Sequence, residues 1–235
     1  GKLAVKTDGT LWGWGQNTNG ELGQNSRTDF SSPKQVPGTT WSAVGGGRKG
    51  YHMVKNDGTL WAVGQNGSGF FGNNQSEGDI GRASSPVQIP GTTWNGSSRG
   101  VAGGYEYAVA LKTDGTLWSW GSNTDGKLGL TNTTAQSSPT QIPGTTWRSV
   151  SAYIYHTLAT KTDGTLWAWG NNDNGQLGQG NQTGYSSPKQ IPGTTWTSNC
   201  SAGSNQSGCV KTDGTLWTWG QNDTGQMGVN DRTTS

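Results

Sequence analysis

Side chains that could perform catalysis are few in this sequence. The two histidines, His52 and His156, stand five and seven residues before the next Asp-Gly pair, so they do not occupy equivalent positions. Nucleophilic catalysis needs a serine or cysteine beside such a base, and no nucleophile elbow accompanies either histidine. We therefore predict structural roles for both histidines and no enzymatic activity.

Metal and cofactor sites are not predicted either. The loop at residues 171–175 resembles a calcium loop but lacks the several carboxylates and the terminal glutamate that such loops use. The glycine-rich turns lack Gly-Lys-Ser/Thr and precede no expected helix, which argues against a phosphate-binding loop. Cys200 and Cys209 alone are too few to hold a metal. They could form a local disulfide if their Cα atoms lie within about 7 Å of each other.

The carboxylates belong mainly to a motif that recurs along the whole chain. Asp-Gly-Thr-Leu-Trp starts at five positions, spaced 49, 57, 49 and 50 residues apart: Asp8, Asp57, Asp114, Asp163 and Asp213. A spacing in this range is typical of repeat folds. Because Asp-Gly supplies the positive-φ position of a tight turn, each copy predicts a β-hairpin whose aspartate bonds to the turn backbone.

The return strand of each hairpin is apolar on both faces. Side chains alternate along a strand, so Trp167 and Trp169 point one way while Leu166 and Ala168 point the other way. The residue after the first tryptophan is always small, which suits a face pressed against a neighbouring sheet. We therefore expect these strands to lie between two layers.

The remaining repeated segments are rich in proline and polar residues. Ser-Ser-Pro and a second proline lead to Gly-Thr-Thr-Trp in four copies, and all eight prolines fall in these positions. Since proline donates no backbone hydrogen bond, it predicts a loop and an edge strand at the rim of each unit. The lysine beside each turn, such as Lys161, is expected to be a solvated hairpin edge.

Composition limits the possible partners. The apolar fraction is 28%, which is low for a folded chain, but the regular placement of the 13 tryptophans favours folding. The net charge of +2 is small and the basic residues are dispersed, so we predict no nucleic-acid partner. No apolar run approaches the roughly 20 residues of a membrane span.

Residues 156–178 resemble the repeat of the regulator of chromosome condensation family, of the alpha-tubulin suppressor type. They read His-Thr-Leu-Ala-Thr-Lys-Thr-Asp-Gly-Thr-Leu-Trp-Ala-Trp-Gly-Asn-Asn-Asp-Asn-Gly-Gln-Leu-Gly, and the resemblance extends over essentially the whole chain. It implies an all-β fold, a β-propeller that usually has seven blades of four strands, and a packing role for His156. We expect a single domain over residues 1–235, with units near 1–41, 42–94, 95–147, 148–196 and 197–235.

The repeat count does not complete a ring of equal blades. Five Asp-Gly hairpins are present, but only four Gly-Thr-Thr-Trp segments. We therefore expect these units to form part of a seven-bladed propeller. A five-bladed ring with an irregular seam is the second choice.

The second unit departs most from the repeat. Val63 replaces a tryptophan, Phe70 and Phe71 replace the usual Gln-Leu, and Trp61 lies 33 residues before Trp94 where other units span 29. Four more extra residues precede Asp114. Extra residues in a repeat often mark the binding face, which makes Phe70 and Phe71 candidate binding residues, although a neutral loop insertion is equally compatible with the sequence.

A binding or structural role is the leading hypothesis. The chain would be a non-enzymatic propeller that presents loops to a protein partner, in a larger assembly such as a virion or at a cell surface. Near-identical repeats rich in Asn, Thr, Gly and Ser resemble those of bacterial surface proteins and phage decoration or fibre proteins.

Two alternatives stay open. A glycan-binding propeller would use the tryptophans beside the proline-containing rim, namely Trp41, Trp94, Trp147 and Trp196. A guanine-nucleotide exchange factor for a small GTPase is implied by the family resemblance alone, and fold analogy is weak support for a function.

Overall fold

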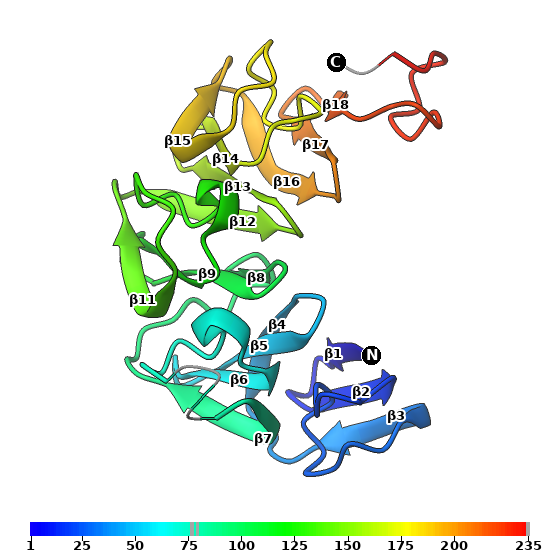
Figure 1. Ribbon diagram of the computed structural model, residues 1–235, viewed down its shortest axis with the longest axis vertical. Coiled ribbons are helices and arrows are strands. Elements are labelled where there is room, and N and C mark those ends of the chain that lie inside the picture. The colour runs from blue at the N-terminus through cyan, green and yellow to red at the C-terminus, as the bar shows by residue number, and fades with distance from the viewer. Residues whose placement is uncertain (76–77, 79, 234–235) are drawn as a thin grey trace.

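Five antiparallel sheets form an open arc in the computed structural model, which describes residues 1–75, 78 and 80–233 (Figure 1). The predicted all-β class is confirmed. The first and last sheets lie at opposite ends of the arc, so the five units do not close a ring on themselves. The second choice, a five-bladed ring, is therefore wrong.

Each sheet is built from strands that follow one another in the sequence. Sheet by sheet, the strands are β1 (Lys2–Val5), β2 (Leu11–Gly15) and β3 (Phe30–Val36); β4 (Trp41–Gly46), β5 (Gly50–Lys55), β6 (Leu60–Gln65) and β7 (Arg82–Ile89); β8 (Val101–Gly103), β9 (Tyr107–Leu111), β10 (Leu117–Gly121) and β11 (Gln136–Ile142); β12 (Trp147–Ala152), β13 (His156–Lys161), β14 (Leu166–Gly170) and β15 (Tyr185–Ile191); and β16 (Trp196–Ala202), β17 (Gln206–Lys211) and β18 (Leu216–Gly220). Two short 3-10 helices, η1 (Gly67–Gly69) and η2 (Thr124–Gly126), lie in the loops after β6 and β10.

The strands have fixed places relative to the arc. β4, β8, β12 and β16 lie toward its concave side and contact one another from sheet to sheet (Figure 1). The Ser-Ser-Pro segments form β3, β7, β11 and β15, each at the outer edge of its sheet. The prediction that proline marks an edge strand at the rim is confirmed.

A hydrogen-bond chain fixes each Asp-Gly turn. Asp163 Oδ1 accepts from the backbone N–H of Thr165 at 3.0 Å and from its hydroxyl at 2.7 Å. Thr165 Oγ1 in turn accepts from Trp167 Nε1 at 2.9 Å. The hydroxyl bond, followed by the backbone bond, lowers the pKa of the Asp163 carboxyl. The same chain of bonds occurs in the other four turns, which explains why aspartate, threonine and tryptophan recur together.

Tryptophans form the contacts between blades, as predicted. Within their own sheet, Trp167 and Trp169 both pack edge-on against Trp147, each at a centroid distance of 6.1 Å, which places them on the same face of their strand. Trp147 and Trp169 also belong to one apolar core with residues of the third blade. Trp169 is fully buried and donates from Nε1 to the carbonyl of Lys127 in the preceding blade at 3.0 Å. Trp120 and Trp219 make the equivalent bonds to Phe70 and Gln176.

A buried asparagine organises the loop after each tryptophan strand. Asn172 Oδ1 accepts from the backbone of Leu177 at 2.8 Å, and Nδ2 donates to the carbonyls of Asn181 at 2.8 Å and Thr183 at 3.0 Å. Equivalent asparagines close the corresponding loops of the other blades: Asn17, Asn66, Asn123 and Asn222. These bonds explain the repeated Asn-x-x-Gly-x-Leu-Gly pattern, because the asparagine satisfies loop groups that no strand pairs.

The lysines beside the turns are not simply solvated. Lys161 Nζ lies 4.7 Å from the ring centroid of Trp147 and 4.5 Å from that of Trp167, so it is held between two indoles. Lys55, Lys112 and Lys211 make the same pair of contacts. These lysines are therefore part-exposed hairpin edges that also gain from the quadrupole of an indole face.

Both histidines are buried packing residues, as predicted. His52 contacts the rings of Phe70 and Trp120, and its Nε2 donates to the carbonyl of Phe70 at 2.9 Å. His156 Nε2 lies 2.8 Å from the hydroxyl of Ser207 in the next blade. Burial lowers the pKa of each imidazole to about 4.

The two cysteines, whose pairing the sequence leaves open, form a disulfide in this structure. Cys200 in β16 and Cys209 in β17 are cross-strand neighbours with a Cα separation of 4.0 Å. Their bond ties the inner strand of the last sheet to the strand beside it. No helix among the described residues is long and apolar enough to span a membrane.

The extra residues before the third hairpin join three blades. In residues 95–100, the carbonyl of Arg99 accepts from the backbone of Val150 in β12 at 3.0 Å. The guanidinium of Arg99 donates from Nη1 to the carbonyl of Cys200 in β16 at 2.7 Å. This insertion therefore has a structural role that its sequence does not reveal.

Candidate protein-interaction surface

The two ends of the strands carry different kinds of loop. Because the strands of a sheet are antiparallel, the Asp-Gly turns and the Gly-Thr-Thr-Trp connections share one end, which we call the turn end. The loops β4–β5, β8–β9, β12–β13 and β16–β17 lie at the other end. Their sequences differ from blade to blade, whereas the turn end is nearly identical in every unit.

Open clefts at the turn end lie between successive blades. A cleft of about 680 Å³ is lined by Lys55, Asp57, Thr93 and Trp94, and clefts of about 440 and 290 Å³ occupy equivalent places beside Trp147 and Trp41. Their linings repeat with the blades. They differ between blades mainly at the residue after each rim tryptophan, which is Ser42, Asn95 or Arg148.

The rim tryptophans do not offer their ring faces to solvent. Trp41, Trp94, Trp147 and Trp196 are only 2 to 4% exposed. Each of them begins or precedes an inner strand and packs against the tryptophans of its own sheet, with a lysine over the ring. The expectation that these four rings are free to stack on sugars is wrong.

Phe70 and Phe71 are likewise buried, at 2% and 0% exposed. Phe70 packs beside His52, and its carbonyl accepts from Trp120 Nε1 at 2.9 Å. Both phenylalanines belong to the apolar core between the second and third sheets. The idea that they form an accessible binding site is contradicted by this burial, because a core side chain cannot reach a partner.

The variable loops near the concave side lie against one another. A Cβ atom at Gly47 would overlap the carbonyl of Gly104, and one at Gly104 would overlap the carbonyl of Tyr153. Glycine is therefore needed at both positions for close approach of the backbones. Loops 47–49, 104–106 and 153–155 consequently form one continuous surface, which we call the inner-loop surface.

Aromatic and charged side chains dominate the inner-loop surface. Tyr153 and Tyr155 are 44% and 41% exposed, and Arg48 is also exposed. Five of the six tyrosines of the chain lie within two residues of these loops: Tyr51, Tyr105, Tyr107, Tyr153 and Tyr155. This clustering is the sequence signal that could have located the surface.

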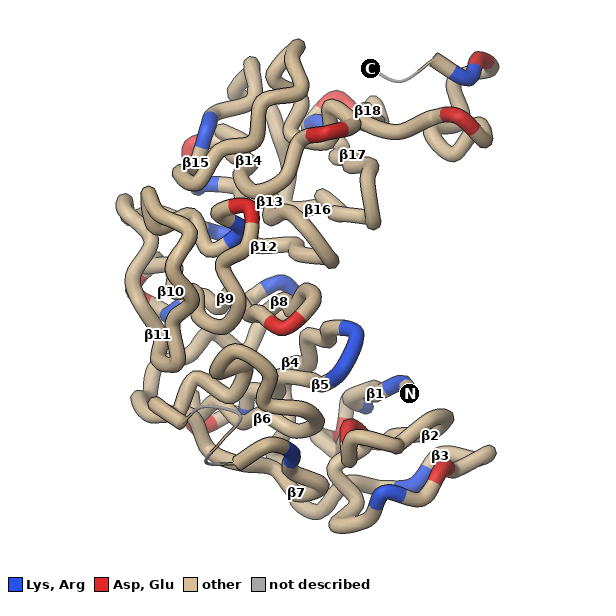
Figure 2. Tube along the Cα trace, viewed as in Figure 1, with Lys and Arg blue, Asp and Glu red and all other residues tan. Residues whose placement is uncertain are grey.

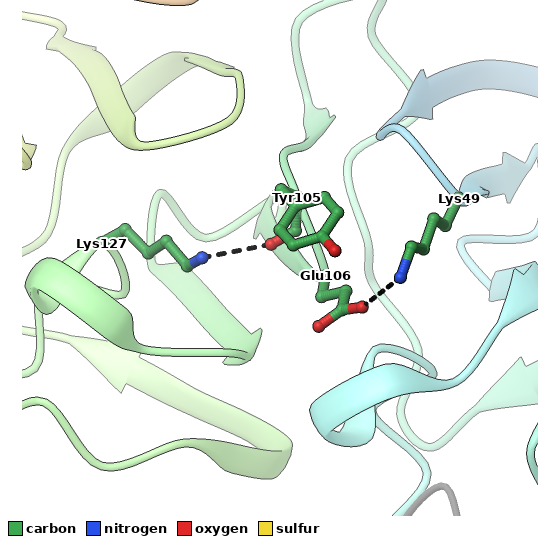
Figure 3. Close-up of polar contacts among 4 residues, drawn as sticks. All are labelled: Lys49, Tyr105, Glu106 and Lys127. Carbon is green, nitrogen blue, oxygen red and sulfur yellow. Dashed lines mark hydrogen bonds and ion pairs between the residues drawn. The ribbon is translucent and has the colours of Figure 1, made fainter.

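The centre of the inner-loop surface is a polar cluster (Figure 3). Lys49 Nζ donates to Glu106 Oε1 at 2.8 Å, and this hydrogen bond raises the pKa of Lys49. From the other side, Lys127 Nζ donates to the carbonyl of Tyr105 at 3.2 Å. Glu106 has a φ of 60°, an uncommon conformation for a residue other than glycine, and its carbonyl accepts from Ser122 at 2.8 Å. These bonds hold the Tyr105 loop in one conformation.

Lys127 differs from its counterparts in the repeat. Glu21, Gln176 and Gln226 bond to the backbone of their own loops. Lys127 instead extends toward the inner loop of its sheet, where it is 3% exposed, and burial lowers its pKa. Sequence reasoning missed Arg48, Lys49, Tyr105, Glu106 and Lys127 because they are far apart in the chain and vary between repeats.

Charge elsewhere is spread thinly. Basic and acidic residues alternate along the arc in Figure 2, without a single face of one sign in that view. Among the described residues, no group of three or more His, Cys, Asp or Glu is placed to hold a metal.

Comparison with known proteins identifies the repeat. A model of the regulator of chromosome condensation (RCC1) repeat matches residues 8–49, 114–160 and 163–210, more than half of the chain. A second model of the same repeat matches residues 99–127 and 147–176. The chain belongs to the RCC1 repeat family.

One curated member of the RCC1 family shows how much sequence is shared. The chain is 31% identical over 145 residues to the ultraviolet-B receptor UVR8 of Arabidopsis thaliana, a match over 59% of this chain and 31% of the receptor. The chain thus spans less than a third of the length of that relative.

Solved structures match this chain over nearly the whole arc. Prp20p of Saccharomyces cerevisiae, the yeast RCC1, aligns over 99% of this chain and 58% of its own with a TM-score of 0.83 and 20% identity; its structure is described with its binding to Gsp1p and histones. The same yeast protein has been solved bound to Kap60. Human WBSCR16 aligns over 93% of this chain and 58% of its own, with a TM-score of 0.80 and 22% identity. These likenesses confirm the predicted β-propeller fold.

Proposed function

We propose that this RCC1-family chain is a non-enzymatic protein-binding module that contacts its partner through the inner-loop surface. The observation that carries the proposal is the contrast between the two ends of the blades. One end repeats the same turns in each unit, while the other brings together loops of different sequence that expose Tyr153, Tyr155 and Arg48. A surface whose parts differ can favour one partner over others, because each part adds its own attractive or repulsive contacts.

The chemistry of the inner loops supports this role. Tyrosine buries a large area with only two rotatable side-chain bonds, and tyrosine and arginine are enriched at binding hot spots. The equivalent β16–β17 loop, outside the inner-loop surface as defined, contains Gly203-Ser204-Asn205, which provide adaptable hydrogen bonds. Because the Tyr105 loop is fixed by hydrogen bonds, little conformational entropy would be lost when it binds.

Affinity capture from native source material, with bound proteins quantified by mass spectrometry, tests the proposal. The variant Tyr153→Ser/Tyr155→Ser should lose the captured partner, whereas the control Thr92→Ala/Thr145→Ala, at exposed turn-end positions, should keep it. Capture that is lost only in the control variant, or is equal in both variants, would refute the proposed surface.

The setting that we propose is a virion or cell-surface assembly, in which the chain would be a decoration or fibre component. The near-identical repeats and the small share of charged residues, 13%, support this setting. Immunogold labelling of intact particles and cells would test it. Labelling confined to free, unassembled protein would exclude it.

Nucleotide exchange on a small GTPase is a second candidate. It is favoured by the alignment with Prp20p, which is described with its binding to Gsp1p, but at 20% identity this likeness shows the fold alone. A nucleotide-release assay with purified small GTPases decides it. An unchanged rate of release in the presence of the chain would remove this candidate.

A further inference from the structure

Three cationic groups surround the ring of Tyr105. The centroid of this ring lies 5.0 Å from Lys49 Nζ, 5.8 Å from Arg48 Cζ and 5.9 Å from Lys127 Nζ. Lys127 Nζ is also 5.2 Å from the ring of Tyr107. The residues come from two sheets and from three separate parts of the chain, so the fold and not the local sequence gathers this charge.

The cluster is only partly neutralised from within. Across the described part of the chain, Lys49 and Glu106 form the only ion pair within 4.0 Å. Lys127 is buried but donates to a backbone carbonyl, with Asp125 and Glu106 acting on it only at longer range. A buried ammonium without a bonded carboxylate is costly, and nearby negative charge offsets that cost.

The accessible part of the cluster suits a carboxylate. The side chains of Lys49 and Glu106 are 29% and 18% exposed, and Arg48 is exposed beside them. Glu106 uses Oε1 to bind Lys49, which leaves further ammonium hydrogens of Lys49 and the guanidinium of Arg48 for an incoming acid. Glu106 thus already shows one carboxylate bound in this cluster.

We propose that Arg48, Lys49, Tyr105 and Lys127 form a recognition site for an acidic segment of the protein partner. This inference rests on the proposed function. A carboxylate of the segment contacts Arg48 and Lys49, and the adjoining part of the segment packs on Tyr105. Lys127 is a positioning residue: it holds the Tyr105 loop through the Tyr105 carbonyl and adds its charge to the field, without touching the partner.

A nucleic acid is the less favoured occupant. Glu106 lies within the cluster and would repel successive phosphates, and the net charge of the chain is only +2. Phosphate recognition also calls for denser lysine and arginine than this surface provides.

Fluorescence anisotropy with the folded chain tests the inference. The probe is a fluorescein-labelled peptide of alternating Glu and Gly, and matched peptides carry Gln or Lys in place of Glu. The acidic peptide should bind at low ionic strength and more weakly as salt rises, because exposed charges are screened. Equal binding of the Gln peptide, tighter binding of the Lys peptide, or tighter binding of a labelled oligothymidine would overturn the inference.

Variants of the cluster should change affinity in opposite directions. Arg48→Gln and Lys49→Gln should weaken binding of the acidic peptide by about tenfold each, in line with the loss of a charge-assisted hydrogen bond. Glu106→Gln should strengthen it by roughly threefold, since a competing carboxylate is removed. Lys55→Gln, at the turn end, is the matched control and should have no effect. Weaker binding by Glu106→Gln, or unchanged binding by both Arg48→Gln and Lys49→Gln, would contradict the site.

Lys127→Gln tests whether Lys127 acts through its charge and its bond to the Tyr105 loop, and not through overall folding. It installs the residue found at the equivalent Gln176 and Gln226, so the variant is expected to fold, which circular dichroism checks. Its affinity should fall, while its salt dependence becomes shallower. If no acidic peptide binds but Tyr153→Ser/Tyr155→Ser still abolishes partner capture, this inference fails and the proposed function stands.

Discussion

At the scale of single residues, the fold is held by polar side chains that recur at the same place in each blade. The turn aspartates, the loop asparagines and the inter-blade indole N–H groups each satisfy backbone that strand pairing leaves free. Because the same bonds occur in successive blades, a substitution in one blade tests a contact that the other blades also use. Two predictions belong at this scale.

The first concerns the two buried histidines. Their pKa is about 4 in the folded chain and near 6.5 when unfolded, so unfolding takes up protons as the pH falls through this window. Their contribution is fully present above pH 6.5 or so and decreases by roughly 1 kcal/mol per pH unit for each histidine on acidification toward 4. Urea unfolding at pH 7 and pH 5 measures the loss.

The double variant His52→Gln/His156→Gln is the control for this pH dependence. Its absolute stability is expected to be lower, but the difference in unfolding free energy between pH 7 and pH 5 should shrink. The turn aspartates should not contribute to this difference, because their pKa values are lowered and the stability that they provide is lost only at more acidic pH. An undiminished difference in the double variant would show that other groups cause the effect.

The second prediction concerns the loop asparagine of the third blade. Asn123→Ala removes a buried side chain that accepts from Leu128 and donates to the carbonyls of Asn132 and Thr134. The unpaired backbone groups should lower the free energy of unfolding by about 3 kcal/mol. Chemical denaturation measures this, and the exposed Asn132→Ala should cost less than about 1 kcal/mol by comparison. Equal costs would mean that the asparagine is not the organiser of its loop.

At the scale of elements, Arg99 makes contacts between blades that the repeat does not explain. It links the insertion at residues 95–100 to β12 through its backbone and to β16 through its guanidinium. We predict that Arg99→Ala lowers the free energy of unfolding by roughly 2 kcal/mol, the cost of losing a charge-assisted hydrogen bond to a part-buried carbonyl.

Hydrogen exchange gives this prediction its local test. The amides of β16 and its neighbour β17 should exchange faster in Arg99→Ala than in the wild type, while β4 to β7 stay unchanged. Ser98→Ala, at an exposed position of the same insertion, is the control and should leave all rates unchanged. Uniform acceleration along the whole chain would contradict a local tie between the third and last sheets.

The hairpins could be predicted from the sequence, whereas the polar cluster of the inner-loop surface could not. Asp-Gly-Thr predicts the turns, the alternation of tryptophans predicts the strands, and proline predicts the edge strands. Each of these predictions depends only on residues that are neighbours in the sequence. Trp94 was expected to be accessible because it follows a Gly-Thr-Thr segment. It is buried because Trp120 and Lys112, which are distant in the sequence, pack on its ring. The Lys49 and Glu106 pair joins residues 57 positions apart, and no repeat predicts that contact.

At the scale of the whole molecule, the open arc places four loops of different sequence, β4–β5, β8–β9, β12–β13 and β16–β17, near its concave side and leaves the repeated turns elsewhere. The RCC1 repeat explains the arc of similar sheets. Sequence differences between its copies produce the varied side chains of the inner-loop surface. In the three solved structures described above, this chain spans 57 to 58% of the protein, so the activities of those whole proteins do not transfer with the fold.

The most direct test of the account is hydrogen exchange on the chain with and without its captured partner. The account predicts that partner binding slows exchange in peptides that contain residues 47–49, 104–106 and 153–155, and leaves the Asp-Gly turns unchanged. Protection confined to the turns that begin at Asp57, Asp114 and Asp163, with the inner loops unprotected, would contradict it.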